Sequence, residues 1–180
     1  MCAKLLILES PGKVKKVQSF LGPDWKVVAS VGHVRDLPVK EMGVAAPDFK
    51  PHYQPTERGA DVLKRLGALA KQADVVYLAT DPDREGEAIA WHVADALKLK
   101  DAKRVTYGEI TESAVKAAVQ SPRAIDMALV AAQEGRRVLD RFCGYLVSGP
   151  LSRAVGTRLS AGRVQSPALR LVVERERAIT

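Results

Sequence analysis

Three acidic residues at alternate positions are the part of this sequence best suited to chemistry. Asp81, Asp83 and Glu85 come shortly after the apolar run 75–79 and open a helical pattern. Carboxylates packed this closely repel one another and cost free energy unless a cation or solvent compensates their charge. Because hard divalent cations prefer oxygen ligands, the spacing predicts a divalent-metal site.

The same residues also have a purely structural interpretation. Asp81-Pro82-Asp83 is a common turn sequence, and Glu85 and Glu87 favour the positive amino terminus of a helix. The acidic run by itself leaves both interpretations open.

A fourth acid, Glu9, ends the apolar run 4–8. If the runs at 4–9 and 75–80 are neighbouring parallel strands, Glu9 and Asp81 reach the same edge of the sheet, where such folds bind ligands. Mg²⁺ typically takes one or two carboxylates together with phosphate oxygens. Glu9, Asp81 and Asp83 are therefore the candidate Mg²⁺ ligands, and Glu85 is expected beside them as a hydrogen-bonding partner or proton carrier.

Lys13 lies at a helix start, in the phrase Ser10-Pro11-Gly12-Lys13. The spacing of a nucleotide-binding P-loop is missing, so ATP binding is unsupported. An amino-terminal helix turn favours anions, and Lys13 could there contact a scissile phosphate or neutralise a leaving oxygen. The alternative is an ordinary exposed lysine beside Lys15 and Lys16.

The elements that must position these residues alternate between strands and helices. We expect strands over residues 4–9, 25–30, 75–80 and 104–107, and helices over 11–21, 57–72 and 85–97, with a further helix capped by Thr111. Ser10 and Pro11 are expected to cap and open the first helix. Residues 39–55 are expected to connect elements without regular structure. This alternation predicts an α/β fold with a mainly parallel sheet flanked by helices.

Composition narrows the class of protein. The chain has 180 residues, 47% of them hydrophobic, which suits one domain and a fragment of another. The formal charge of +7 favours a polyanionic partner, although many globular proteins are equally basic. Cys2 and Cys143 are too few and too far apart for a disulfide framework, and the sequence shows no signal-peptide or membrane-span pattern. We expect a cytoplasmic protein with no membrane association.

Longer phrases carry a family resemblance. Glu9 after a strand, followed by Asp81-x-Asp83-x-Glu85, resembles the Toprim domain of topoisomerases, bacterial primases and some nucleases. The phrases at 30–38, 80–87, 133–141 and 159–170 are together similar to the bacterial type IA topoisomerases of the topoisomerase I kind. The resemblance implies a Rossmann-like Toprim domain over residues 1–125 and, over 126–180, the start of a helical DNA-binding topoisomerase domain.

The resemblance also implies an activity. Type IA enzymes relax negatively supercoiled DNA without ATP, using Mg²⁺ and transient cleavage and religation of a single strand by a tyrosine. Tyr53, Tyr77, Tyr107 and Tyr145 all lack the family's Ile-Thr-Tyr-x-Arg context. We therefore expect an amino-terminal fragment that holds the acidic half of the active site and is inactive alone in strand cleavage. We also expect the protein to be monomeric and nucleoid-associated.

Arginine is the only cation after Lys116, and its planar fork suits phosphate. The alternative is solvated helix pairs, which we favour for Arg175 and Arg177. The resemblance implies that a wider set of residues contacts single-stranded DNA. Within this set, Arg136 and Asp140 would orient the DNA strand. His33 would lie near the DNA, although the alternative for a single loop histidine is a structural role. The set is His33, Arg136, Arg137, Asp140, Arg141, Arg153, Ser160, Arg163 and Gln165.

Two rival functions remain at this point. A Toprim nuclease or primase would use the same acids without a tyrosine, and Mg²⁺-dependent cutting or primer synthesis by this chain would favour it. A non-catalytic single-strand DNA-binding module would show steep salt dependence and no metal response. The phrase at 160–165 argues against the first rival, and the acidic cluster argues against the second.

Overall fold

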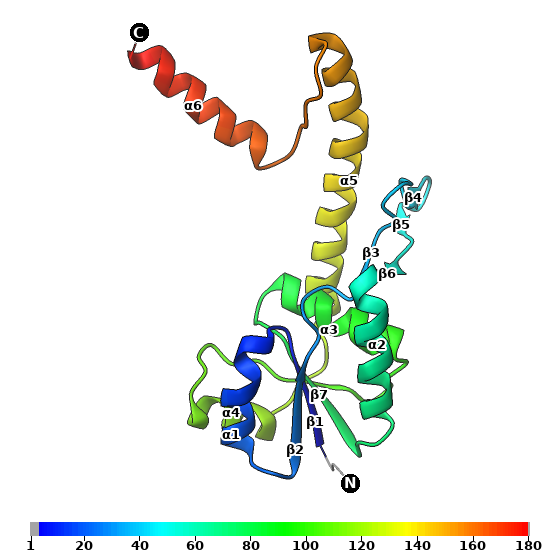
Figure 1. Ribbon diagram of the computed structural model, residues 1–180, viewed down its shortest axis with the longest axis vertical. Coiled ribbons are helices and arrows are strands. Elements are labelled where there is room, and N and C mark those ends of the chain that lie inside the picture. Colours follow the sequence, from blue (N-terminus) through cyan, green and yellow to red (C-terminus); the bar gives the residue numbers. More distant parts are fainter. Residues whose placement is uncertain (1–3, 180) are drawn as a thin grey trace. The chain divides into compact units, whose positions relative to one another are not determined.

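Four parallel strands form the central sheet of the computed structural model, which describes residues 4–179 (Figure 1). The strand order is β2-β1-β7-β8, with bounds β1 Lys4–Leu8, β2 Trp25–Ala29, β7 Val75–Ala79 and β8 Lys103–Arg104. The predicted parallel sheet is confirmed. Cys2 lies outside the described residues.

Helices cover both faces of this sheet because side chains alternate along each strand. In β1, Leu5 and Ile7 pack in one hydrophobic cluster with residues of α2 (Glu57–Ala70) and α3 (Arg84–Ala96). Leu6 and Leu8 pack in a second cluster with residues of α1 (Val14–Leu21) and α4 (Glu112–Gln120). The predicted α/β layers are therefore observed.

The helix starts agree with the predicted caps except at the first helix. Thr111 Oγ1 accepts a hydrogen bond from the Ala114 N–H at 3.3 Å and caps α4 as expected. Ser10 occupies the N-cap position and Pro11 opens the helical segment as predicted, but the Ser10 side chain makes no capping bond. The chain instead forms a 3₁₀ turn, η1 (Pro11–Lys13), whose Lys13 N–H donates to the Ser10 backbone carbonyl before α1 begins.

Residues 39–55, predicted to lack regular structure, contain three two-residue strands. β4 (Val44–Ala45) pairs with β5 (Lys50–Pro51), and β6 (Gln54–Pro55) pairs with β3 (Arg35–Asp36). Proline has no N–H to donate, which limits each ladder to a few bonds.

The chain divides into two compact units. The first comprises the residues up to Asp36 together with Tyr53–Gln133, and the second comprises Leu37–His52 together with the residues from Glu134 onward. Helix α5 (Met127–Val155) begins in the first unit and continues in the second, which also contains α6 (Gln165–Ile179). The domain boundary between residues 125 and 126 stays a prediction. Within residues 4–179, no helix has the length and apolar character needed to cross a membrane.

Candidate functional site

The acidic residues gather at the carboxyl edge of the sheet. β1 and β7 are parallel neighbours in register, with Leu8 opposite Ala79. Glu9 follows the first of these residues, and Asp81 comes two positions after the second. The edge of the sheet at which ligands bind in α/β folds is therefore the edge that carries both acids, as the sequence predicts.

Lys13 pairs with Asp81 rather than pointing into solvent. Its Nζ lies 2.7 Å from Asp81 Oδ1, and the two side chains are 31% and 47% exposed. The η1 turn brings the ammonium group to the edge of the sheet that carries Glu9, Asp81 and Asp83, here called the acid edge, where it compensates part of the negative charge. Both groups keep enough exposure to meet a ligand.

Asp83 caps the helix that follows the acidic run. Its Oδ1 accepts a hydrogen bond from the Gly86 N–H at 2.7 Å, and its backbone is extended, as at many helix starts. The structural interpretation of the acidic run is thus correct for one oxygen of Asp83. Because the residue is exposed, its second oxygen can still serve a ligand.

Two side chains contact one oxygen of the Glu85 carboxylate. His33 Nε2 lies 3.3 Å from Glu85 Oε2, and Gln133 Nε2 donates to the same oxygen at 3.2 Å. Glu85 therefore lies beside the other acids as an oriented carboxylate. Sequence reasoning did not select Gln133, which is 6% exposed although it belongs to the phrase at 133–141.

The donor set fits an open Mg²⁺ site and not a closed cage. Among residues 4–179, no three His, Cys, Asp or Glu side chains are close enough together to hold a metal by themselves. Asp81 and Asp83 nevertheless offer hard oxygen atoms at an accessible edge, and the Glu9 carboxylate makes no hydrogen bond or ion pair within this range. One or two carboxylates are all that Mg²⁺ requires when waters and phosphate oxygens complete its shell.

A buried ion cluster behind the acid edge was not predicted. Glu87 is fully buried and accepts hydrogen bonds from Arg104 Nε at 3.0 Å and from Arg123 Nη1 at 2.7 Å. Burial alone raises the pKa of Glu87, but the bonds from Arg123, the Asp126 N–H and Arg104 outweigh burial and lower the pKa to about 2. Glu87 is therefore ionised inside the protein. The sequence signal was a carboxylate flanked by Gly86 and the small apolar run 88–90, where an unpaired charge would be costly.

Arg104 fixes the backbone of the acidic segment. Its Nη1 donates to the carbonyls of Leu78 and Thr80 at 3.1 and 2.8 Å, and its Nη2 donates to the Asp81 carbonyl at 2.8 Å. The guanidinium is fully buried, and burial lowers its pKa against the opposing effect of Glu87. The residue that follows β7 is thus held by a cation on β8.

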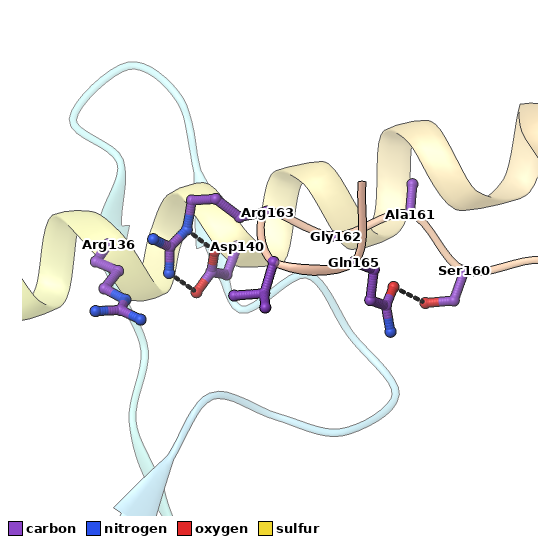
Figure 2. Close-up of a pocket in the computed structure, with 8 residues that line it drawn as sticks. Arg136, Asp140, Ser160, Ala161, Gly162, Arg163 and Gln165 are labelled. Carbon is purple, nitrogen blue, oxygen red and sulfur yellow. Dashed lines mark hydrogen bonds and ion pairs between the residues drawn. The ribbon is translucent and has the colours of Figure 1, made fainter. Parts of the chain in front are cut away.

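The second unit contains a cavity of about 330 Å³ that collects five of the residues predicted to bind DNA (Figure 2). Asp140 accepts two hydrogen bonds from Arg163, at 2.7 and 3.1 Å. Hydrogen bonding from Arg163 lowers the pKa of Asp140 despite its partial burial. Ser160 Oγ lies 3.1 Å from Gln165 Oε1. The cavity is lined by Arg136, Asp140, Ser160, Ala161, Gly162, Arg163, Val164 and Gln165.

The other predicted DNA contacts lie elsewhere. Arg141 donates to the backbone carbonyls of Pro38 and Glu41 at 2.7 and 3.2 Å, so it ties α5 to the segment 37–52. Arg137 and Arg153 lie on α5 outside the cavity lining, and His33 is the partner of Glu85 described above. Their contact with DNA stays a prediction.

Each of the four tyrosines has a structural setting. Tyr77 is 7% exposed and packs on Trp25 with ring centroids 4.9 Å apart. Tyr53 packs edge-on against His92 at 4.4 Å. Burial raises the pKa of Tyr107 to about 12, assisted by the charge of Asp81. The apolar sequence around Tyr145 predicts a packed side chain, but Tyr145 is 42% exposed and its hydroxyl donates to the Val39 carbonyl at 3.0 Å.

A parallel sheet that presents Glu9 and Asp81 at its carboxyl edge, with helices on both faces, defines a Rossmann-like domain with an acidic edge. Residues 4–112 match the family model described as the Toprim domain, and the chain belongs to this family. Residues 124–180 match the model described as DNA topoisomerase. The family resemblance predicted from the sequence is confirmed.

Individual relatives agree with the family assignment. The chain is 68% identical over 176 residues to DNA topoisomerase I, plasmid, of Xylella fastidiosa (strain 9a5c), a match that covers 98% of the chain and 27% of that protein. Full-length topoisomerase I from Thermotoga maritima matches with a TM-score of 0.85 and 44% identity, over 96% of this chain and 30% of that one. The chain thus spans about a quarter to a third of the length of these relatives.

Proposed function

We propose that this chain supplies the acidic half of the active site of a type IA DNA topoisomerase. The observation that carries the proposal is the exposed acid edge of a Toprim domain, joined in one chain to topoisomerase sequence. The activity would be the relaxation of negatively supercoiled DNA without ATP, by transient cleavage and religation of one strand. The attacking tyrosine would come from a part of the enzyme that this chain does not contain.

Asp81 and Asp83, with Glu9 beside them, are the proposed Mg²⁺ ligands. When bound, the cation would neutralise charge on the reacting phosphate and help hold the broken end in place. Lys13 already lies 2.7 Å from Asp81, and its ammonium would contact the phosphate as negative charge develops there. Glu9 would assist proton transfer to the 3′ oxygen as that oxygen leaves phosphorus. Glu85, oriented by His33 and Gln133, would carry protons at this edge.

The cavity in the second unit is the proposed contact for single-stranded DNA. Arg136 and Arg163 would bind phosphate oxygens, while Ser160 and Gln165 supply neutral donors and acceptors. Asp140 holds the Arg163 guanidinium in place through two bonds, which presents the remaining N–H groups in one direction. We further propose that the protein acts as a monomer on nucleoid DNA in the cytoplasm.

A chimaera tests this proposal directly. The chain would replace the matching 27% of the Xylella topoisomerase, and relaxation of a negatively supercoiled plasmid would be followed without ATP. We expect Mg²⁺-dependent relaxation by the chimaera. Replacing both Asp81 and Asp83 by alanine should slow religation by at least tenfold, because the ligands for the cation are lost.

The matched control replaces Asp24 and Asp61, two exposed acids outside the acid edge, by alanine. Normal relaxation by the Asp81 and Asp83 double variant at limiting Mg²⁺ would refute the proposed metal site. Cutting of DNA or synthesis of primers by the 180-residue chain alone would instead favour the nuclease or primase alternative.

A further inference from the structure

Glu87 is a junction between elements of the first unit, although it does not face the acid edge. Its Oε2 accepts hydrogen bonds from Arg104 Nε at 3.0 Å and Arg123 Nη2 at 2.9 Å. Its Oε1 accepts from Arg123 Nη1 and from the Asp126 N–H, both at 2.7 Å. A buried carboxylate that accepts four hydrogen bonds holds its partners in position, because moving any one of them weakens the compensation of a buried charge.

One side of this junction leads to the acid edge. Arg104 links the Glu87 carboxylate to the backbone carbonyls of Thr80 and Asp81, at 2.8 Å each. The two carbonyls lie on either side of the Asp81 Cα atom, from which the Asp81 side chain extends. Glu87 therefore acts on Asp81 through one intervening guanidinium.

The other side leads to the start of α5. The Asp126 N–H donates to Glu87, while the Asp126 carboxylate accepts from the N–H groups of Ala128 and Leu129 at 2.9 and 3.2 Å. Arg123 contributes twice, through its bidentate grip on Glu87 and through backbone hydrogen bonds with Arg104 at 2.8 and 3.0 Å. The first turn of α5 is thus capped by a residue whose own backbone is bound to Glu87.

We infer that Glu87 is a positioning residue that couples the first turn of α5 to the backbone at Asp81. Loosening the α5 side of the junction then loosens the acid edge, and the coupling operates equally in the reverse direction. Its consequence for Mg²⁺ affinity rests on the proposed function, whereas the coupling itself does not.

Arg123 is the residue at which the coupling can be tested without removing a core group. Its side chain is 41% exposed, whereas Glu87 and Arg104 are buried. The variant R123Q removes both charged hydrogen bonds to Glu87, and R123K keeps the charge but cannot form a bidentate pair. The matched control is R58Q, at an exposed arginine on α2.

The first measurement is amide hydrogen exchange in the 180-residue chain, followed by NMR without metal. In R123Q we expect exchange to become at least tenfold faster at Gly86, Glu87, Ala128 and Leu129, with Leu6 in β1 unchanged and R123K intermediate. R58Q should match the wild type. Wild-type exchange rates at the four positions in R123Q would overturn the coupling.

The second measurement is titration of the same proteins with MgCl₂, following the amide signals of residues 80–86. R123Q should bind Mg²⁺ about tenfold more weakly than the wild type, a change within the range typical of coupling between separate sites. If the wild type shows no response to Mg²⁺, the proposed function fails and the exchange rates alone decide the coupling. If R123Q exchanges faster but binds Mg²⁺ as tightly as the wild type, Glu87 is only structural and the positioning role is overturned.

Discussion

Single titratable residues set how this fold responds to acid. His92 is buried against Tyr53 and Trp91, with ring centroids 4.4 and 4.8 Å away, and its Nδ1 lies 3.1 Å from Arg35 Nη2. Burial, reinforced by the positive charge of Arg35, lowers the pKa of His92 from 6.5 to about 3. The neutral ring accepts a hydrogen bond from Arg35, and protonation would break that bond and place two cations together.

The low pKa of His92 makes stability depend on pH in a defined window. The unfolded chain binds a proton near pH 6.5 and the folded chain only near pH 3, so the stabilisation is present above pH 6.5 and is lost as the pH falls towards 3. Its slope approaches about 1.4 kcal/mol per pH unit. The glutamine of H92Q cannot be protonated. We therefore expect the free energy of unfolding of H92Q, measured by urea denaturation, to change less between pH 6.5 and 4.5 than that of the wild type.

Glu87 does not interfere with this measurement, because its pKa moves from 4.5 to about 2 and its contribution is lost only below pH 4.5. An unchanged slope in H92Q above pH 4.5 would show that His92 does not control acid sensitivity. The exposed acid Asp24, replaced by asparagine, provides a control that should leave the slope unchanged.

At the scale of elements, the sequence predicted the helices and strands that depend on local patterns of residues. Apolar runs identified β1 and β7, β2 was predicted over 25–30, and helical periodicity with the Thr111 cap identified the helices around them. β8 was predicted over 104–107 but spans only Lys103–Arg104, and Arg104 also forms an isolated antiparallel bridge with Arg123. The Glu87 cluster depends on pairing between residues 17 and 36 positions apart, which no local pattern reveals.

The acid edge could be predicted from the sequence, whereas the Lys13 contact could not. Parallel pairing of two strands suffices to bring Glu9 and Asp81 to the same edge of the sheet, whereas the Lys13 contact depends on the 3₁₀ turn with which the first helical segment begins. In the second unit, the family resemblance selected five of the residues that line one cavity, but the tie of Arg141 to the segment 37–52 required the structure.

The first turn of α3 has no room for a side chain at Gly86. A Cβ atom there would collide with the Asp81 backbone, and Thr80 Oγ1 donates to the Gly86 carbonyl at 2.5 Å. We expect G86A to lower the free energy of unfolding by about 1–3 kcal/mol through overpacking and to weaken Mg²⁺ binding, because the Asp81 backbone must shift. Chemical denaturation and MgCl₂ titration measure the two effects.

Gly135 in α5 provides the matched control, since no atom lies within 4 Å of the position that its Cβ would occupy. G135A should raise stability by up to about 1 kcal/mol, because alanine favours helix more than glycine does. Wild-type stability in G86A would show that the turn can relax without strain.

At the scale of the whole molecule, most of the buried core lies in the first unit and the arginine-lined cavity lies in the second. Nearly all fully buried hydrophobic residues lie in the first unit, whereas α6 has no buried residue and α5 buries only Val130 and Gln133 among the described positions. The second unit instead presents arginine, with its cavity lined by Arg136 and Arg163. Most of the formal net charge of +7 therefore falls in the second unit, where it can attract a polyanion.

Salt dependence of DNA binding tests whether the cavity contacts phosphate. Each phosphate contact made by a cation on single-stranded DNA contributes a slope of about 0.7 to the plot of log K against log salt concentration. We expect R163Q to weaken binding of a fluorescent oligothymidylate and to reduce this slope by roughly that amount, as measured by anisotropy between 50 and 200 mM salt. R175Q, at an exposed position on α6, carries the same loss of charge and should retain the wild-type slope. Equal slopes for R163Q and the wild type would mean that Arg163 serves only Asp140, and equal losses in both variants would mean that net charge, and not the cavity, attracts the strand.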